Sequence, residues 1–476
     1  MDTLALLNEI GLKITNLTVN ELKITEVKQA SFEEYGYPFE NLKYTYPSTL
    51  HHNSLSKACK ENYLDTLNNM QLLRKVTRQI PSDIITSSTS AFHLSDYSVF
   101  TKGKPDDEVY KTHELLRLHI PRGLTVLEID SEILDYVIYA NRKFDGSTVE
   151  DDEIKSTAGA VVDNIDQNLH FIENNDINTT HQIIAVEKMN GEAGHFSCRI
   201  IDGEEYLIAG SKKVHILFKT YEDIEKYTED RYQFAKMVAK TLLEHLDRLA
   251  PELRQILCRF LATTKLTVIC ELLNPHHQHV VSLKDLNCNI LTVLNITTFS
   301  LNNNKSLTMF SIPTTFSFMN LFGFKTPKYE IITTDNGDNI KNNLNKHIST
   351  TRGKLNTEGV VYYHEDLNGN TIGLVKLKTR WYVYLRALRE KATAVYKKNL
   401  SESKYHQNVK KRLAEIKRWL DTPEDEHNEW QNLASRWIVW VCERKTYNTD
   451  GSEIRNNFSF VWEQFIQQCN IESKLL

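Results

Sequence analysis

The sequence predicts an α+β fold, in which a core of antiparallel sheets precedes an all-helical C-terminal domain. Residues 106–385 hold short apolar runs separated by turns, with few of the strand–helix–strand units that parallel strands require. Residues 386–476 instead carry apolar residues at helical spacing. Residues 1–105 mix both patterns and are expected to form an accessory N-terminal segment, to which the sequence assigns no function.

The composition limits the class of protein and its compartment. The chain has 476 residues, enough for two or three domains, and its net charge of −5 gives no global basicity that would indicate a nucleic-acid partner. Its seven cysteines include no C-x-x-C pair, which argues against a disulfide framework or a zinc knuckle and fits a reducing compartment. Without a signal layout or a membrane-spanning apolar run, the sequence predicts a cytoplasmic protein with no membrane partner, although a nuclear location is also compatible.

Residues 183–218 are predicted to be the centre of the catalytic domain. They contain three short strands, separated by an N-G turn at 190–191 and a D-G turn at 202–203. Lys188 therefore stands at the end of a buried strand, directly before a tight turn, and a hairpin is expected to fold against it. A buried lysine is costly unless it is paired or used. Lys188 is therefore a candidate nucleophile.

Two copies of the pattern K-x-[DN]-G compete for this role, and the pattern resembles the nucleophile motif of the covalent nucleotidyltransferases. Residues 188–191 read K-M-N-G, and residues 143–146 read K-F-D-G. The second copy leads into the acidic stretch 147–156, which shows no strand alternation, whereas the first leads into the predicted hairpin. We therefore expect Lys188, and not Lys143, to be the nucleophile.

Lysines and carboxylates further along the chain supply the other groups that adenylyl transfer needs. Lys376 and Lys378 lie two apart on a predicted strand, so both side chains should enter one pocket and neutralise the α-phosphate as pyrophosphate leaves. Crowded cations should also depress the pKa of Lys188, because only the neutral amine attacks phosphorus. Glu271 and Glu358, on separate strands, can hold ribose hydroxyls and a magnesium ion.

The order of these groups resembles the ATP-dependent RNA ligases, and within them the phage tRNA-repair branch, which the fungal tRNA ligases approach. The similarity rests on IPRGL (120–124), ANRKF (140–144), CELLNPHHQHVV (270–281) and LVKLKTRWYV (374–383). It implies an ATP-grasp-like nucleotidyltransferase core in the antiparallel region. It also implies a ligase that joins RNA 5′-phosphate and 3′-hydroxyl ends through a lysyl-AMP intermediate, with ATP and Mg²⁺ as cofactors, in RNA or tRNA repair.

The resemblance further implies roles for individual residues. Lys188 would be the catalytic nucleophile, and Glu271 and Glu358 would also serve the metal. The residues expected to bind the nucleotide are Arg122, Lys143, Asn190, Gly191, Lys212, Glu271, Glu358, Lys376, Lys378 and Tyr382.

The aromatic residue that stacks on adenine cannot be placed from the sequence. Inserts at 146–180 and 280–350 stretch the spacing between motifs, so that Phe318 and Phe322 are only candidates. Three histidines within residues 276–279 suggest zinc, but adjacent histidines in a hairpin loop lack ligand geometry.

Three functions remain open at this point. The first is an RNA ligase, expected to be a monomer, with RNA (a tRNA among the candidates) as its partner. The second is another covalent nucleotidyltransferase, a DNA ligase or a GTP-using capping enzyme. Those enzymes carry a β-barrel after the K-x-K strand, whereas this chain continues as helices. The third is a catalytically silent RNA-binding relative, against which the intact lysines and carboxylates argue.

The stretch from Lys376 to Arg418 is strongly basic. It contains 14 Lys or Arg residues against three Glu. Such a run is often a solvated helical face. Because this one begins at the last strand of the candidate site, it could equally be a surface for a phosphate backbone.

Overall fold

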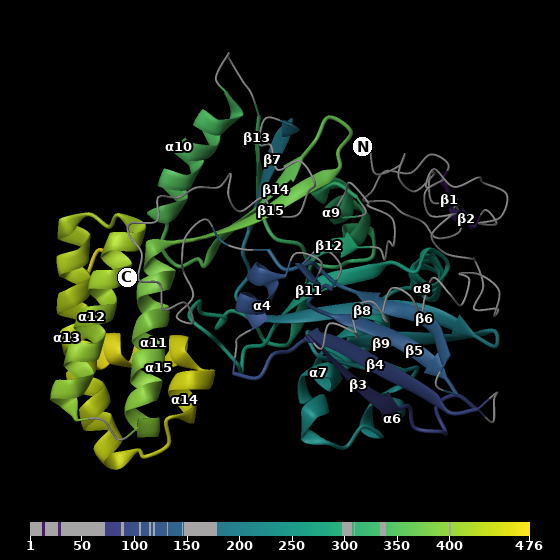
Figure 1. Cartoon of the computed structure of the whole chain (residues 1–476), viewed down its shortest axis with the longest axis horizontal. Coiled ribbons are helices and arrows are strands. Elements are labelled where there is room, and N and C mark those ends of the chain that lie inside the picture. The colour runs from purple at the N-terminus through teal and green to yellow at the C-terminus, as the bar shows by residue number, and fades with distance from the viewer. Residues whose placement is uncertain are drawn as a thin grey trace.

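The computed structural model of the chain describes residues 72–144 and 179–476 with short gaps, together with Gly146 and two short strands, β1 (Leu12–Ile14) and β2 (Val27–Gln29) (Figure 1). The gaps are residues 87–89, 104–105, 114–115, 118–119, 131, 298–306, 309, 334–338 and 399–400. Most of the acidic insert expected at 146–180 therefore lies outside the described residues.

A five-stranded sheet forms the largest layer of the core. Its order is β10-β9-β8-β11-β12, and every neighbouring pair is antiparallel. The strands are β8 (Glu192–Ile201), β9 (Glu204–Ser211), β10 (Val214–Phe218), β11 (Thr267–Leu273) and β12 (Ile290–Thr297). The predicted turn between β8 and β9 is confirmed, since Asp202 and Gly203 have φ values of 49° and 83°, which a type I′ hairpin requires.

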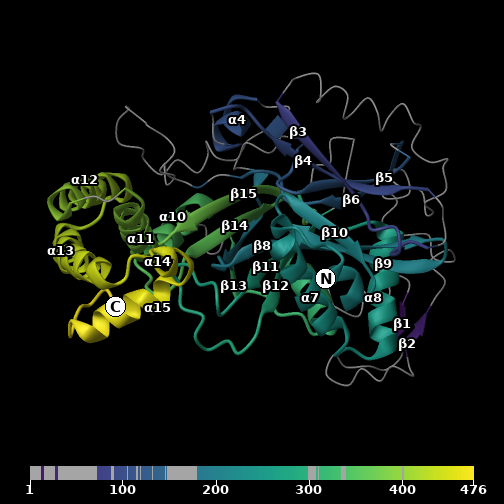
Figure 2. The same cartoon turned by 90° about the horizontal axis from the view of Figure 1, so that it is seen from below.

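Helices cover one face of this sheet and bury the main apolar core (Figures 1 and 2). They are α6 (Tyr221–Glu225), α7 (Gln233–Leu246), α8 (Pro251–Thr264) and α9 (Ile312–Leu321). Val238, Leu242 and Leu246 recur every four residues along α7 and are all buried, so the helical spacing of the sequence sets the face that packs on the sheet.

A second sheet, of order β13-β7-β14-β15, carries the strand before Lys188. It contains β7 (Gln182–Glu187), β13 (Tyr329–Ile332), β14 (Gly359–Glu365) and β15 (Thr371–Lys378). The predicted hairpin between the first two central strands is wrong, because β7 pairs with β13 and β14 while β8 pairs with β9 and β11. Residues 188–191 therefore carry the chain from one sheet to the other, and α10 (Ile340–Arg352) packs beside the second sheet.

A third sheet packs on the side of the five-stranded sheet that faces away from α7 and α8 (Figure 2). Its strands are β3 (Leu73–Gln79), β4 (Phe92–Val99), β5 (Leu124–Ile129) and β6 (Glu132–Tyr139), and α4 (Asp106–Thr112) lies between β4 and β5 in the chain. Strands β3 and β4 belong to the stretch expected to be accessory, yet β4 pairs along its length with β5. Residues 73–79 and 92–99 of this stretch thus contribute directly to the core.

The chain ends in a helical domain with its own core. Its helices are α11 (Arg380–Lys398), α12 (Glu402–Leu420), α13 (Glu424–Tyr447), α14 (Ser452–Asn456) and α15 (Phe458–Gln468). Trp430 and Trp437 are fully buried at its centre. The prediction that the last strand continues to Leu385 is wrong, because β15 ends at Lys378 and α11 begins at Arg380. The Thr379 hydroxyl caps this helix by accepting the backbone N–H of Tyr382 at 3.0 Å. Among the helices described, none is both long and apolar enough to cross a membrane.

Buried charges join the five-stranded sheet to the third sheet. Asp135 on β6 accepts from Arg199 Nε at 2.7 Å and lies 3.2 Å from Lys265 Nζ. Burial disfavours the Asp135 carboxylate, but Lys265 and Arg199 outweigh burial and lower its pKa below the ordinary value. This ion cluster contributes stability above the ordinary aspartate pKa of about 3.9 and loses it as pH falls further.

Replacing Asp135 with alanine should lower the free energy of unfolding by about 3–5 kcal/mol, because Arg199 and Lys265 would remain as uncompensated buried cations. Denaturant unfolding at pH 7 measures this loss. Glu463→Ala is the control, since it removes only the exposed partner of Lys284 at 3.1 Å and should cost at most about 1 kcal/mol. Equal losses in the two variants would contradict a structural role for the buried cluster.

Candidate active site

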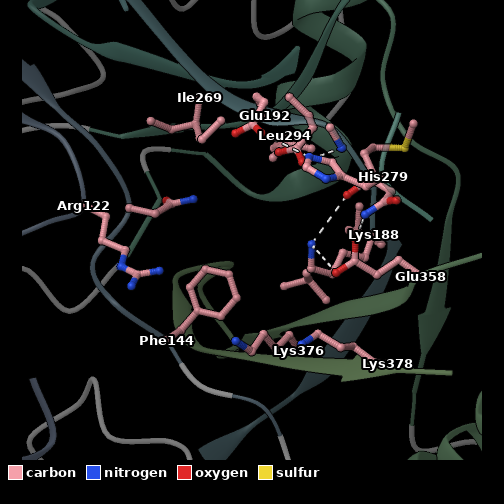
Figure 3. Close-up of a pocket in the computed structure, with 18 of the residues that line it drawn as sticks. Arg122, Phe144, Lys188, Glu192, Ile269, His279, Leu294, Glu358, Lys376 and Lys378 are labelled. Carbon is pink, nitrogen blue, oxygen red and sulfur yellow. Dashed lines mark hydrogen bonds and ion pairs between the residues drawn. The ribbon is translucent and has the colours of Figure 1, made fainter. Parts of the chain in front are cut away.

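A pocket of about 470 Å³ opens where the five-stranded sheet, the sheet of β7 and β14, and the start of α11 meet (Figure 3). The structure brings every sequence-predicted site residue to its wall, namely Arg122, Lys143, Lys188, Asn190, Gly191, Lys212, Glu271, Glu358, Lys376, Lys378 and Tyr382. These residues come from distant parts of the chain, so their convergence is a property of the fold. Their individual roles stay predictions.

Lys188 is held at the junction of the two sheets by a carboxylate. Its Nζ lies 3.0 Å from Glu358 Oε1, and its backbone N–H donates to the carbonyl of Gly359 at 2.8 Å (Figure 3). Glu358 directly precedes β14, which pairs with β7, so the pairing register sets this contact. The Lys188 side chain remains 23% exposed toward the pocket, whereas that of Glu358 is only 5% exposed. The amine is therefore fixed yet reachable.

The pKa of Lys188 shifts in the direction opposite to the expectation. Burial disfavours the charged amine, but the carboxylates of Glu358 and Glu271 outweigh burial and raise the pKa of Lys188 above its ordinary value. The expected depression by crowded cations is thus wrong for the ligand-free protein. Lys188 is protonated at neutral pH and must lose a proton before it can act as a nucleophile, and Glu358 is the acceptor in contact with it.

Asn190 ties three parts of the site together. Its side-chain nitrogen donates to Glu358 Oε2 at 2.7 Å and to the Tyr382 hydroxyl at 3.2 Å. Its side-chain oxygen accepts the backbone N–H groups of Val280 and Val281, both at 3.0 Å. Because all four bonds fix the amide orientation, an asparagine is required here in this chain: an aspartate would place a second carboxylate against Glu358.

Gly191 permits a close crossing of two strands. A Cβ atom at this position would lie 2.3 Å from the carbonyl oxygen of Leu272, which no side chain can tolerate. The Gly191 backbone N–H in turn donates to Glu271 Oε1 at 3.0 Å. Burial raises the pKa of Glu271, against the opposing effect of Lys188. The last residue of K-M-N-G therefore positions a carboxylate of β11 beside Lys188.

An aspartate that the sequence did not single out organises the opposite wall. Asp107, on α4, accepts from Arg122 Nη2 at 2.8 Å and lies 3.0 Å from Lys143 Nζ. The Lys143 side chain is 3% exposed, so the rival K-F-D-G copy also delivers its lysine to the pocket, but as a buried partner of Asp107. An acidic residue at the start of a helix carries no distinctive sequence signal, which explains why Asp107 was missed.

Lys376 and Lys378 enter the pocket from the same face of β15, as their spacing predicted (Figure 3). Val361 and Gly359 of β14 stand opposite them in the register. Since the carbonyl of Gly359 also accepts the backbone N–H of Lys188, β14 positions all three lysines relative to one another.

The first turns of α11 form part of the pocket. Tyr382, Arg386, Arg389 and Glu390 all line it, at spacings that put them on one face of a helix. Only Tyr382 was predicted, because the strand was expected to continue through this segment. Helical spacing from Thr379 onward was the signal that could have revealed Arg386 and Arg389.

The aromatic side chain of the pocket differs from the candidates. Phe318 and Phe322 are 0% and 1% exposed and pack against each other in the core, at 5.2 Å between ring centroids. Both candidates for adenine stacking are therefore wrong. Phe144 and Tyr363 line the pocket instead, and in Figure 3 the Phe144 ring lies between Arg122 and Lys188.

Two histidines of the loop after β11 gather around a glutamate. His277 and His279 lie within reach of Glu192, and the three form the one group of potential metal ligands within the described part of the chain. Arg389 Nη1 lies 3.0 Å from His279 Nδ1, and a guanidinium can only donate, so Nδ1 accepts. The ring hydrogen is then on Nε2 and donates to Glu192 at 3.1 Å. In that tautomer Nδ1 accepts from Arg389 and Nε2 carries the hydrogen, so neither nitrogen of His279 offers a lone pair to zinc.

The donor set of the pocket fits a nucleoside triphosphate with a hard divalent cation. Nine cationic side chains line it against six carboxylates, which suits a polyanion. Glu271 and Glu358 offer the oxygen ligands that Mg²⁺ prefers, and a bound cation there would neutralise phosphate charge. Each oxygen of Glu358 already has one partner, Lys188 or Asn190, so a metal bound there would share the carboxylate with them.

Comparison with known proteins bears on this region of the chain. Residues 162–382, slightly less than half of the chain, match the family model described as RNA ligase. Comparison with curated proteins gives no match. One similar solved structure is an archaeal ATP-dependent RNA ligase, form 1, at 12% identity and a TM-score of 0.44, covering 82% of this chain and 81% of that chain.

Another similar structure is a Naegleria gruberi RNA ligase mutant with ATP and Mn, at 12% identity and a TM-score of 0.29, covering 66% of this chain and 98% of that chain. The functional conclusion rests on the family match. That match covers Lys188, Glu271, Glu358 and the K-x-K strand, and it confirms the predicted enzyme class, an RNA ligase.

Proposed function

We propose that this RNA ligase uses ATP and works through a covalent Lys188–AMP intermediate. The observation that carries the proposal is the position of Lys188 at a sheet junction, where carboxylates lie on one side and the K-x-K lysines on the other. Because Glu358 raises the pKa of Lys188, the amine is protonated before the reaction. It becomes a nucleophile when its proton passes to that carboxylate.

In the first step Lys188 Nζ, after losing a proton to Glu358, attacks the α-phosphorus of ATP. A P–N bond forms and the bond to pyrophosphate breaks, while Lys376 and Lys378 stabilise the charge on the phosphate oxygens. Phe144 and Tyr363 are aromatic side chains of the pocket that could contact the base, and Arg122 with Lys143 and Lys212 can hold phosphate or ribose oxygens. The AMP group then passes to an RNA 5′-phosphate, and an RNA 3′-hydroxyl displaces it.

Finer parts of the proposal follow from the sequence resemblance. The RNA ends joined would be a 5′-phosphate and a 3′-hydroxyl. The enzyme would belong to the phage tRNA-repair or fungal branch and act on a tRNA-like substrate. Its core would be ATP-grasp-like, and its metal would be Mg²⁺ held by Glu271 and Glu358. The proposal also includes a cytoplasmic monomer with a catalytic domain, to which β3 and β4 of the predicted N-terminal segment (1–105) contribute, and a basic helical domain that begins with α11.

The other candidate functions have less support. A DNA ligase or capping enzyme would continue as a β-barrel after the K-x-K strand, whereas the described residues after β15 are helical. A silent RNA-binding relative would have no reason to keep the Lys188–Glu358 pair, whose desolvation is costly.

Lys188→Ala should abolish covalent labelling by ATP carrying ³²P at the α-phosphate, measured after denaturation, because no other amine occupies the end of β7. Lys143→Ala is the matched control from the rival motif and should weaken labelling without abolishing it, since Arg122 still pairs with Asp107. GTP labelled in the same way should give no adduct. An adduct that survives in Lys188→Ala, or one that forms only with GTP, would refute the assignment.

The rate of adduct formation should increase as pH rises from about 7 to about 9, because only the neutral amine attacks and the pKa of Lys188 is raised. Glu358→Gln should move this rise to lower pH, while the maximal rate falls with the loss of the proton acceptor. Glu390→Gln removes another pocket carboxylate, paired with Arg386 at 2.8 Å, and should keep the wild-type profile. An unchanged profile in Glu358→Gln would contradict the pairing argument.

RNA affinity should depend on exposed lysines of α12. The basic run is not uniform: Lys410 and Lys411 are exposed, whereas Arg412 is buried with its guanidinium 4.6 Å from the Trp419 ring. Replacing Lys410 and Lys411 with glutamate should weaken RNA binding. The slope of the logarithm of the RNA binding constant against the logarithm of salt concentration should become shallower by about 0.7 for each RNA phosphate that is no longer neutralised.

The same charge change at Lys341 and Lys346, exposed on α10, controls for net charge in this RNA-binding measurement. Adduct formation with ATP alone verifies that both variants are folded. If the two double variants bind RNA equally well, the exposed face of α12 is only a solvated surface.

A further inference from the structure

A buried chain of polar side chains links the third sheet to the pocket. Asp96 on β4 lies 2.8 Å from His215 Nδ1 on β10, and the hydroxyl of Thr125 donates to the same aspartate oxygen at 2.7 Å. His215 Nε2 in turn lies 3.1 Å from His195 Nδ1 on β8, and His195 lines the pocket. All four side chains are buried. Arg78 forms an ion pair with the other oxygen of Asp96 and compensates its charge.

The His195 ring is also held in place by close packing against the backbone of Gly123. A Cβ atom at Gly123 would lie 2.6 Å from its Cε1 and 2.8 Å from its Nδ1. Gly123 follows Arg122, which lines the same pocket, so the glycine of this Arg-Gly element leaves room for the histidine ring. Its φ of 127° is a second reason why only glycine suits the position. The ring therefore has one position, set by His215 on one side and by Gly123 on the other.

This arrangement selects one tautomer of His195. Asp96 accepts the hydrogen of His215 Nδ1, which leaves His215 Nε2 as an acceptor and requires a hydrogen on His195 Nδ1. His195 Nε2 then carries a lone pair, and no partner for it exists among the residues that the structure describes. Burial, His215 and Lys212 lower the pKa of His195 below its ordinary value, so the ring is neutral near pH 7.

The proposed ligase reaction contains one step that needs such a group. In the first step the nucleophile is Lys188, which already contacts a proton acceptor, Glu358. In the second step the nucleophile is an RNA 5′-phosphate, which has no proton to lose. In the third step it is a ribose 3′-hydroxyl, which must lose its proton as it attacks.

We propose that His195 is the general base that takes the proton of the RNA 3′-hydroxyl in the sealing step. The inference rests on the proposed ligase function and deepens it. The 3′-oxygen forms a bond to the phosphorus of the adenylylated 5′-end, the bond from that phosphorus to AMP breaks, and the proton moves to His195 Nε2. The imidazolium that results keeps its Nδ1 hydrogen bond to His215, whose own bond to Asp96 lets the buried carboxylate stabilise the positive charge.

The charged groups around His195 are consistent with this role. Lys212 at the β9–β10 turn and His215 disfavour its protonation in the empty site, whereas Asp96 favours it through its bond to His215. Bound RNA phosphates would offset the charge of Lys212. The base must be neutral to act, so the sealing rate should be full above the pKa of His195 and fall as pH drops through it, below about 6.5.

The test uses the whole chain, an RNA strand that is already adenylylated at its 5′-end, an acceptor RNA with a 3′-hydroxyl, and no ATP. Wild-type protein should seal these strands with a rate that falls on the acid side of the pH profile. His195→Gln should lower the sealing rate by about 10²- to 10⁴-fold and abolish the acid limb, and it should reduce formation of the Lys188–AMP adduct far less.

His245→Gln is the matched control. His245 is a partly buried histidine whose pKa is likewise lowered, but it lies outside the pocket, where it bonds the Phe322 carbonyl at 2.8 Å. It should retain both activities and the acid limb. Equal losses of adduct and sealing in His195→Gln, or a normal sealing rate with the acid limb intact, would overturn the proposal.

The wild-type pH profile tests the proposal even if His195→Gln fails to fold, since a sealing rate without an acid limb refutes it. A wild-type protein that forms no adduct and seals nothing would instead refute the ligase function itself.

Discussion

The contact between Lys188 and Glu358 is the constraint on which the rest of the site depends. A lysine and a glutamate removed from bulk water stabilise the fold only if their geometry is good and their remaining hydrogen bonds are made. Asn190 meets that condition by donating to the second oxygen of Glu358. The amide oxygen of Asn190 accepts the backbone N–H groups of Val280 and Val281. The residue that completes the buried ion pair therefore also fixes the loop after β11.

The helical domain is part of this arrangement, since Thr379 alone separates α11 from the last residue of β15. Thr379 caps the helix, and Tyr382 in its first turn serves more than the helical bundle, because its hydroxyl accepts from Asn190 inside the pocket. Further along the same face, Arg389 contacts His279. Any movement of α11 relative to the sheets would therefore disturb the groups around Lys188, and the two domains cannot act independently during nucleotide binding.

The sequence predicted those features that depend on local pattern. The end of a strand at Lys188, the shared face of Lys376 and Lys378, the D-G hairpin at 202–203 and the C-terminal helices all follow from spacing within a few residues. The pairing of β7 with β14 could not be predicted in this way, because the partners are more than 170 residues apart. The sign of the Lys188 pKa shift depends on that pairing, since it brings Glu358 to the amine. Asp107 and Phe144 enter the pocket from a short helix and a loop, where no periodic pattern marks a residue.

The acids that line the pocket explain how so many cations can share it before any ligand binds. Asp107 holds Arg122 and Lys143 at 2.8 and 3.0 Å, and Glu358 holds Lys188, so each cation keeps a defined position at a modest electrostatic cost. A triphosphate that enters must share or replace these contacts, which reduces the net gain from its charge. Glu358, which raises the pKa of Lys188, is thus also one of the carboxylates with which a bound phosphate would compete for its cation.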